Sequence, residues 1–394
     1  MKKNNTARTQ AELATKKTIR QIQGQAAKER LTIGIDLGDR YSSYCILNEQ
    51  GEVVIEDKLT TTKTGLNRLL EKMPASRVAL EVGTHSPWVS RHVSALGHEA
   101  IVANPRSLGW ITQSRNKNDR VDAEKLARMA RVDVKLLAPI QHRGEQAQRD
   151  LAVIRARETL VEARTKVINS ARGLMKSMGE RLKSCDSEQV GMELAEPLGE
   201  AARTIVKPLL QAVADLSAQV DAYEGQIGEI AKRYPDIELL TAVHGVGDLT
   251  ALTFLLTIED ATRFHRSREV GAFLGMQPRR DQSGARDPQL GISKQGDRHL
   301  RWMLIQCAHC ILRRGAPDSD LRRWGLAKLA EGTTGQQDKP GKKGKRKSKK
   351  KRVLVAVGRK LAVLLHHLWV NGEVYDPLYQ AKAAAAAAGK KAIA

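Results

Sequence analysis

The sequence predicts an α/β domain with a mixed sheet, then two long helices, then a mostly α-helical C-terminal domain. Three observations predict this order. Short apolar runs alternate with turns and helical spacing over 31–103, and apolar residues recur near heptad spacing over 144–233. The third is an apolar helix, a Gly-x-Gly turn and a second helix over 239–251. A chain of 394 residues has room for two or three such domains.

The charge of the chain narrows the class of partner. The formal net charge is +22 and the pI is near 10.0, which favours a polyanion, with nucleic acid as the first candidate. A basic surface also binds anionic membranes, but the apolar runs look too short to span one, so we expect no membrane partner. The N-terminus lacks the apolar core of a signal peptide, and four scattered cysteines form no disulfide framework. We therefore expect a cytoplasmic, nucleoid-associated protein.

The N-terminal domain opens with a predicted three-stranded meander over 31–57, turning at 38–40 and at 48–52. A helix over 65–73, a strand over 77–82, a helix over 86–96 and a strand over 98–103 follow. Ser86 is the candidate N-cap of the second helix, with Pro87 at its first position. A meander followed by alternating helices and strands predicts a mixed sheet.

Four carboxylates mark the ends of these elements. Asp36 and Glu81 lie at strand exits, and Asp119 and Asp122 are three apart on the first turn of a further helix. A ribonuclease-H-like sheet would gather them at one edge, where they repel one another unless a cation lies between them. Mg²⁺ or Mn²⁺ suits such oxygen ligands and pairs with phosphate substrates. A lone Asp after an apolar strand is more often a turn or cap residue, and Asp119 and Asp122 alone could be charges that complement the helix dipole, so the prediction depends on the four together.

The middle of the chain has the apolar spacing of long helices rather than of alternating strands and helices. Two long helices are predicted over 144–184 and 195–233, with Pro208 starting or kinking the second. Their apolar stripes with charged flanks suit a helical hairpin or coiled coil, and a plain helical bundle is the alternative. Residues 1–30 form a basic N-terminal arm, which either contacts nucleic acid or is a solvated tail.

Two motifs in the C-terminal part are of kinds that bind phosphate groups. Gly245 and Gly247 form a helix-hairpin-helix signature, where backbone amides approach DNA phosphates, although a plain helix–helix turn has the same pattern. Further on, glycines and arginines surround Ser283 and Ser293. A loop serine beside guanidinium groups can attack phosphorus, although most loop serines only form hydrogen bonds. The candidate phosphate ligands are Arg279, Arg280, Lys294 and Arg301.

A basic, low-complexity stretch follows. Residues 339–352 hold ten basic side chains and no acid, and 353–370 is again an apolar helix. We therefore predict an insertion loop over 330–352 that lies on a nucleic-acid face, with a solvated linker as the alternative. The candidate contacts in it are Lys342, Lys343, Lys345, Arg346 and Lys347.

Several segments of the chain resemble the IS110/IS1111 group of transposases. They are residues 34–36, 80–81, 104–105 and 117–123, and the glycine-flanked segment around Ser283. The resemblance implies a RuvC-like domain over 31–140 with a D-E-D-D metal tetrad at Asp36, Glu81, Asp119 and Asp122. It implies a helical, coiled-coil region over 141–235, a C-terminal transposase domain over 236–378 and a tail over 379–394. The chain departs from the family pattern at Asn118, where Thr is usual, and at 82–84, where Ala-Thr-Gly is commoner.

The same resemblance implies a DNA recombinase in which Ser283 attacks a phosphodiester, Ser293 being the fallback nucleophile. It implies a guide RNA from the same element and a homodimer or homotetramer. Three other readings stay open. A RuvC-like nuclease would use water and leave Ser283 dispensable, and a nucleoid-binding protein would need no metal. An actin-like ATPase would share the 34–38 phosphate loop, but its second phosphate loop and adenosine motif are missing from the sequence.

Overall fold

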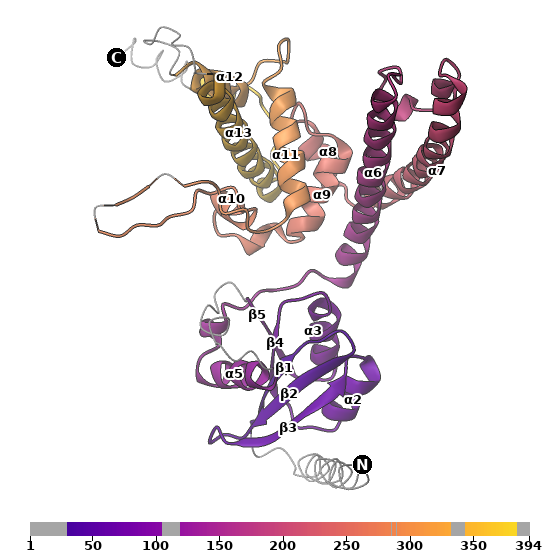
Figure 1. Cartoon of the computed structure of the whole chain (residues 1–394). Coiled ribbons are helices and arrows are strands. Elements are labelled where there is room, and N and C mark those ends of the chain that lie inside the picture. Colours follow the sequence, from indigo (N-terminus) through magenta and orange to yellow (C-terminus); the bar gives the residue numbers. More distant parts are fainter. Residues whose placement is uncertain (1–29, 105–118, 285, 289, 332–342, 384–394) are drawn as a thin grey trace, which may run out of the picture. The chain divides into compact units, whose positions relative to one another are not determined.

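The computed structural model describes residues 30–104, 119–284, 286–288, 290–331 and 343–383, with the backbone alone described at 119 and 343–348. The predicted N-terminal arm before residue 30 and the tail from 384 onward lie outside these residues. The chain forms two compact units, Met1–Arg143 and Gly144–Ala394, which Figure 1 shows in indigo to magenta and in magenta to yellow. Each unit is described by itself.

The first unit is built on a five-stranded mixed sheet in the order β3-β2-β1-β4-β5. The first three strands form the predicted antiparallel meander, and β4 and β5 continue the sheet in parallel with β1. The strands are β1 (Thr32–Asp36), β2 (Tyr41–Leu47), β3 (Val53–Thr60), β4 (Arg77–Glu81) and β5 (Glu99–Ala103). The prediction of a mixed sheet is confirmed.

Helices cover both faces of this sheet. Side chains alternate along β1, so Ile33 and Ile35 pack with α2 (Lys63–Leu70) and α3 (Ser86–Ala95) on one face. The opposite face carries α5 (Asp119–Val132), whose alanines pack on the small residues of β2 and β4. The sheet is therefore buried on both sides, as expected for a domain with parallel strands.

The start of α3 differs from the prediction. Ser86 is the first helical residue rather than the N-cap, which is His85. The Ser86 hydroxyl accepts a hydrogen bond from the Gly83 amide at 3.0 Å and donates to the Gly83 carbonyl at 2.8 Å. It also lies 2.8 Å from Nε2 of His142. Ser86 therefore fixes the loop that follows β4 instead of capping the helix.

His98, just before β5, is a buried neutral histidine. The Ser76 amide donates to its Nδ1 at 3.2 Å, and its Nε2 donates to the Leu70 carbonyl at 3.1 Å. Burial lowers the pKa of His98, and the Leu70 contact opposes this only in part. Between its folded pKa and the unfolded value of about 6.5, the unfolded state binds more protons than the folded state. The first unit should therefore lose stability as the pH falls below about 6.5.

We expect His98→Gln, which cannot titrate, to flatten this pH dependence while it lowers stability at pH 7.5. Amide hydrogen exchange of peptides from β4 and β5, compared between the two proteins at pH 7.5 and pH 5.5, measures it. Comparison at equal pH cancels the intrinsic pH dependence of exchange. An equal change in protection for both proteins between the two pH values would contradict the prediction.

The second unit begins with two long helices, α6 (Glu145–Ser177) and α7 (Glu200–Ala231), which pack along each other (Figure 1). Both start and end inside the predicted ranges. Pro208 lies within α7 rather than at its start. At the distal end, a separate core joins α6, α7 and the connecting turns through Ile168, Met175 and Val206. The pair is a helical hairpin, and a coiled coil remains a prediction.

The base of this hairpin shares one core with the C-terminal helices. Leu151 and Ile154 of α6 and Ile227 of α7 belong to the same buried cluster as Phe254 and Leu361. This cluster joins the hairpin base to α8 (Asp236–Thr241), α9 (Asp248–Ile258), α10 (Val270–Phe273), α11 (Arg298–Ile311) and α13 (Lys343–Asn371). The helical region was predicted as a separate segment, but the structure makes it part of one unit with the C-terminal helices.

The helix α13 occupies the last ten residues of the predicted insertion loop, 343–352. The loop was expected to run from 330 to 352, yet α12 (Asp320–Ala330) ends at its first residue and α13 begins at Lys343. The segment Lys349–Asn371 is long and apolar enough to cross a membrane by length and composition, contrary to our expectation that no run was. Half of that segment is buried, and Val357, Leu361 and Leu365 lie in the core, which is the pattern of a core helix.

Candidate active site

Asp36 and Glu81 end neighbouring parallel strands. In the β1–β4 ladder Ile35 pairs with Leu80, and the next residue along each strand is the carboxylate. Parallel strands bring their carboxyl ends to the same edge of the sheet, which is where ligands bind in open α/β sheets. Both residues are partly exposed there. The predicted juxtaposition of Asp36 and Glu81 is therefore present in the backbone.

The helix α5 brings its first turn to the same edge. A Cβ added to Gly34 would lie 2.0 Å from the Ala123 carbonyl oxygen, so the middle of β1 touches the helix directly. Near the other end, Arg77 at the start of β4 donates to the Ala130 carbonyl at 2.8 Å. The helix therefore runs antiparallel to β1 and β4. Its N-terminal turn, with Asp119 and Asp122, lies toward the strand exits.

The side chains at this edge are placed only in part. Asp122 is largely buried, and its nearest described cation is the Lys125 ammonium at 3.7 Å. The side chain of Asp119 lies outside the described residues. Among the side chains that the structure describes, no three acidic, histidine or cysteine groups converge closely enough to hold an ion. The carboxylates are the oxygen donors that Mg²⁺ or Mn²⁺ prefers, and the tetrad remains a prediction.

Two residues at the rim of this edge were missed by the sequence interpretation. His85, after β4, and Asp39, after β1, lie 3.7 Å apart. Trp88 donates from its indole nitrogen to Nδ1 of His85 at 3.1 Å, so a neutral His85 carries its proton on Nε2, toward Asp39. The loops that follow β1 and β4 therefore meet beside Asp36 and Glu81. The only signal in the sequence was that each residue follows a predicted ligand by three or four positions.

Ser283 lies at the tip of a long hairpin in the second unit, which we call the serine arm (278–292). At its base Pro278 bridges Ile292, and at its tip the backbones of Ser283 and Arg286 exchange both hydrogen bonds, at 3.0 and 3.1 Å. Ser283 is exposed, and Figure 1 shows the arm projecting from beside α10. Ser293, the fallback nucleophile, lies at the base, where its amide donates to the Gln277 carbonyl at 2.8 Å.

The base of the serine arm is fixed by close backbone packing. Gly275 has φ of +68°, and a Cβ there would lie 2.0 Å from the Gln295 carbonyl oxygen. Beside it, Asp297 caps α11 by accepting from the Leu300 amide at 2.7 Å, and it also forms an ion pair with Arg155 of α6. The arm is therefore anchored to both α11 and the hairpin helix α6.

Arg301 does not have the position that we predicted for a phosphate ligand. Only 8% of the residue is exposed. Its guanidinium donates from Nη1 to the carbonyls of Leu274, Gln295 and Gly296 at 2.6 to 3.1 Å. These contacts hold the arm base, and they correct the predicted role.

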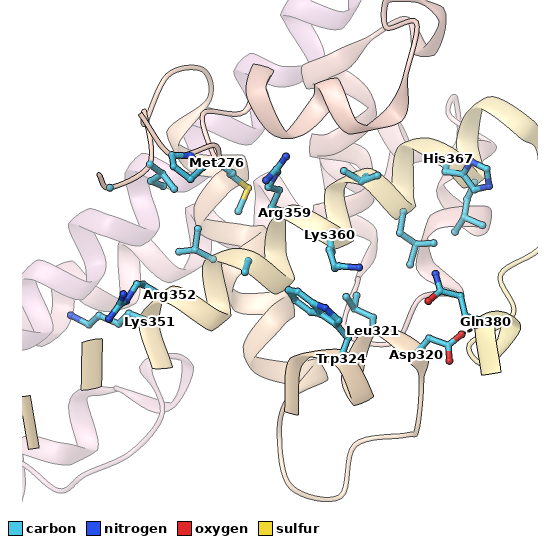
Figure 2. Close-up of a pocket in the computed structure, with 18 of the residues that line it drawn as sticks. Met276, Asp320, Leu321, Trp324, Lys351, Arg352, Arg359, Lys360, His367 and Gln380 are labelled. Atoms are coloured by element: carbon cyan, nitrogen blue, oxygen red, sulfur yellow. Dashed lines mark hydrogen bonds between the residues drawn. The ribbon is translucent and has the colours of Figure 1, made fainter. Parts of the chain in front are cut away.

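The other candidate phosphate ligands line a groove of about 1620 Å³, shown in Figure 2. Arg279, Arg280 and Lys294 belong to its wall on the side of the serine arm. Lys351 and Arg352, from the end of the predicted basic insertion, also line it. Lys342 lies outside the described residues, as do the side chains of Lys343, Lys345, Arg346 and Lys347.

The two glycines of the predicted helix-hairpin-helix differ in their surroundings. Gly245 has φ of +89°, and a Cβ there would lie 3.1 Å from Cβ of Cys310 in α11. The space beside Gly245 is therefore occupied by α11 and leaves no room for a phosphate. Gly247 is the N-cap of α9 and has no atom within 4 Å of its Cβ position. Of the two, only Gly247 leaves room for a phosphate, so DNA contact at this turn stays a prediction.

Comparison with known proteins adds independent evidence. The family model for DEDD transposases of IS110 elements matches residues 33–179, and the model described as "Transposase IS116/IS110/IS902 family" matches residues 237–322. The transposase for insertion sequence element IS1111A of Coxiella burnetii is 28% identical over 78% of this chain and 85% of its own length. The transposase for IS1328 of Yersinia enterocolitica is 28% identical over 72% and 84%, and a probable family 20 transposase of Pseudomonas aeruginosa is 27% identical over 74% and 87%.

The first match spans the strand-exit carboxylates and α5, and the second spans the serine arm and its base. The predicted metal ligands therefore fall in the first matched region and the predicted nucleophile falls in the second. The two regions together cover more than half of the chain. The chain belongs to the IS110 family of transposases.

Proposed function

We propose that this transposase cuts and rejoins DNA through Ser283, assisted by the carboxylate edge of the first unit. The presentation of Ser283 carries this proposal: the hydroxyl lies at the exposed tip of an arm whose base is rigidly held. An exposed serine on a projecting arm can reach a bulky substrate such as a DNA duplex. Exposed Arg279 and Arg280 on the same arm can stabilise charge on the attacked phosphate.

The proposed reaction conserves the energy of the phosphodiester bond. Oγ of Ser283 attacks phosphorus and loses its proton, the bond from phosphorus to one deoxyribose oxygen breaks, and that oxygen leaves as a protonated hydroxyl. A phosphoserine diester then joins the protein to one DNA strand. A hydroxyl from another strand attacks the same phosphorus and releases Ser283, so the strands rejoin without ATP.

The DEDD domain implies that a divalent metal ion is used. In the proposal Asp36, Glu81, Asp119 and Asp122 hold Mg²⁺ or Mn²⁺, because their backbones reach one edge of the sheet and their oxygens suit hard cations. A bound ion would supply positive charge to phosphate oxygens. Half-buried Asp36 and Glu81 would orient it from the strand ends.

A guide RNA from the same element and a homodimer or homotetramer complete the proposal. The resemblance to the IS110/IS1111 group motivates both. The net charge of +22 supports them in part, because a complex with both DNA and RNA carries a large negative charge to neutralise. The second unit offers unpaired basic side chains for this on the groove beside the serine arm.

Loss of the Ser283 hydroxyl is expected to abolish both recombination and a denaturation-resistant protein–DNA adduct, because no other atom forms the phosphoserine bond. The assay runs wild type and Ser283→Ala with labelled element DNA and the transcript of the flanking region on a denaturing gel. Mass spectrometry of the linked peptide then identifies the attached residue. We expect recombination to fall by at least about a thousandfold, as for other nucleophile deletions.

Ser293→Ala is the matched control, since Ser293 lies at the arm base and its backbone keeps the bond to Gln277. It should still form the adduct. An adduct that persists in Ser283→Ala but is lost in Ser293→Ala would move the nucleophile to Ser293. Cleavage without an adduct in any protein would instead favour a nuclease that uses water at the carboxylate edge.

A further inference from the structure

The groove in the second unit is too large for a small-molecule site. Its volume of about 1620 Å³ exceeds the roughly 300–1,000 Å³ of pockets that enclose small ligands. Its walls come from the serine arm, α12, α13 and the segment that follows α13. In Figure 2, Lys351 and Arg352 lie at one end, Asp320 and Gln380 at the other, and Trp324 between them. These dimensions suit a stretch of polymer.

The rim of the groove carries positive charge without partners. Within the described part of the chain, none of the six basic residues on the arm side and along α13 has a recorded ion pair or side-chain hydrogen bond. They are Arg279, Arg280, Lys294, Lys351, Arg352 and Arg359. The acids at the far end are already engaged: Asp376 pairs with Lys382 at 2.9 Å, and Asp320 accepts from the Gln380 amide at 2.7 Å. Asp287 of the serine arm also lines the groove, so one carboxylate stands against these six cations, and the net positive charge of the rim suits a polyanion.

The floor of the groove is apolar around the indole ring of Trp324, and Tyr375 and Tyr379 also line the groove. Met276, Leu321, Val355 and Leu364 line it around Trp324, and the Lys360 ammonium lies over one face of the indole, 4.6 Å from the ring centroid. An intact duplex hides its bases and would offer such a floor only sugars and phosphates. A single strand exposes base faces, which stack on aromatic rings, while its phosphates meet basic side chains. The combination of basic rim and apolar floor therefore favours a single strand over a duplex.

We propose that this groove binds a single-stranded segment of DNA, with phosphates on the basic rim and a base stacked on Trp324. The inference rests on the proposed function, since the strand that it holds is the one that Ser283 attacks. The choice of DNA follows from continuity: Arg279 and Arg280 belong both to the groove wall and to the strand of the arm that leads to Ser283. Unpaired nucleotides next to the attacked phosphodiester would lie along this wall.

The test measures binding of a fluorescein-labelled 12-mer of deoxythymidine to the full chain in EDTA by fluorescence anisotropy. We expect the oligonucleotide to bind more tightly than a 12-base-pair duplex or a 12-mer of uridine. Trp324→Ala should weaken its binding by about tenfold, as expected for the loss of one stacked base. Trp324→Phe, which keeps an aromatic face, should restore most of it, whereas Trp324→Leu, which keeps apolar bulk without a ring, should bind as weakly as Trp324→Ala; rescue by Leu would mean that lost packing of α12 is the cause.

A second pair of variants tests the rim independently of Trp324. Lys351→Ala/Arg352→Ala should make the slope of log affinity against log salt shallower by about 1.4, because two phosphate contacts are lost from a single strand. The control, Lys166→Ala/Lys207→Ala, removes two exposed charges from the hairpin helices and should leave the slope unchanged. Equal slopes for the two double variants would overturn the proposal.

Two further outcomes would also overturn it: wild-type affinity in Trp324→Ala, or tighter binding of the duplex or of the uridine 12-mer with the same dependence on Trp324. Ser283→Ala separates this inference from the proposed function. It should bind the oligonucleotide normally while forming no adduct. Failure of the adduct assay together with groove-dependent binding would reject the nucleophile and keep the groove.

Discussion

Asp36→Asn is expected to abolish strand exchange while the protein stays folded. Asp36 is the last residue of the central strand β1, and it reaches the edge that also receives Glu81 and the first turn of α5. Replacing a carboxylate by an amide removes a charge from the proposed ion site but keeps the shape of the side chain. A metal ion supplies several kcal/mol of transition-state stabilisation, which corresponds to about a thousandfold in rate or more.

The measurement combines the recombination assay with isothermal titration of Mn²⁺. Glu81→Gln, Asp119→Asn and Asp122→Asn should behave like Asp36→Asn in both. Asp39→Asn is the matched control, because Asp39 is almost fully exposed on the next turn and is not a predicted ligand. Full activity in EDTA, or wild-type Mn²⁺ binding by Asp36→Asn, would reject the metal site.

Gly34→Ala is expected to disrupt the first unit itself. The new methyl group would lie 2.0 Å from the Ala123 carbonyl oxygen and 2.6 Å from the Ala127 amide nitrogen. Both are backbone atoms of α5, so no side chain can move aside, and the whole helix must shift away from the sheet. Overpacking usually costs about 1–3 kcal/mol, and contact with a rigid backbone places this substitution at or above the upper limit.

Hydrogen exchange of peptides from β1 and α5 measures the effect, with limited proteolysis as a second readout. Gly83→Ala is the control: it also lies in the first unit beside a predicted ligand, but a Cβ there meets nothing within 4 Å. We expect Gly83→Ala to keep wild-type protection. Equal protection in Gly34→Ala would mean that α5 does not pack on β1 as described.

The sheet was predictable because its signals are local. The meander turns, the apolar runs of β4 and β5 and the order of the elements all appear in short stretches of sequence, and they yielded the mixed sheet. The position of Asp36 beside Glu81 followed from that order alone. Ser86 was mistaken for a cap because serine before proline has the same local pattern whether it caps a helix or fixes the loop before it.

The second unit was harder to predict because its decisive contacts are distant in sequence. Arg301 beside a glycine-rich loop looks like a phosphate ligand, yet it binds the Leu274 carbonyl, 27 residues away. The base of the hairpin joins the C-terminal core through Ile154 and Phe254, which heptad spacing cannot show, because an apolar stripe does not identify its partner. The serine arm has no apolar face, so its hairpin pairing left no periodic signal.

The ion pair between Arg155 and Asp297 connects the long helical hairpin to the root of the serine arm. The helix α6 has 33 residues, so it is a rod of about 50 Å. Arg155 lies in the first third of this rod, and Asp297 ties it to the cap of α11 at the root of the serine arm. The ion pair therefore holds α6 near one end and leaves most of its length beyond the contact. A load on the far end of the hairpin would therefore reach the root of the serine arm, which carries the proposed nucleophile Ser283, through this ion pair.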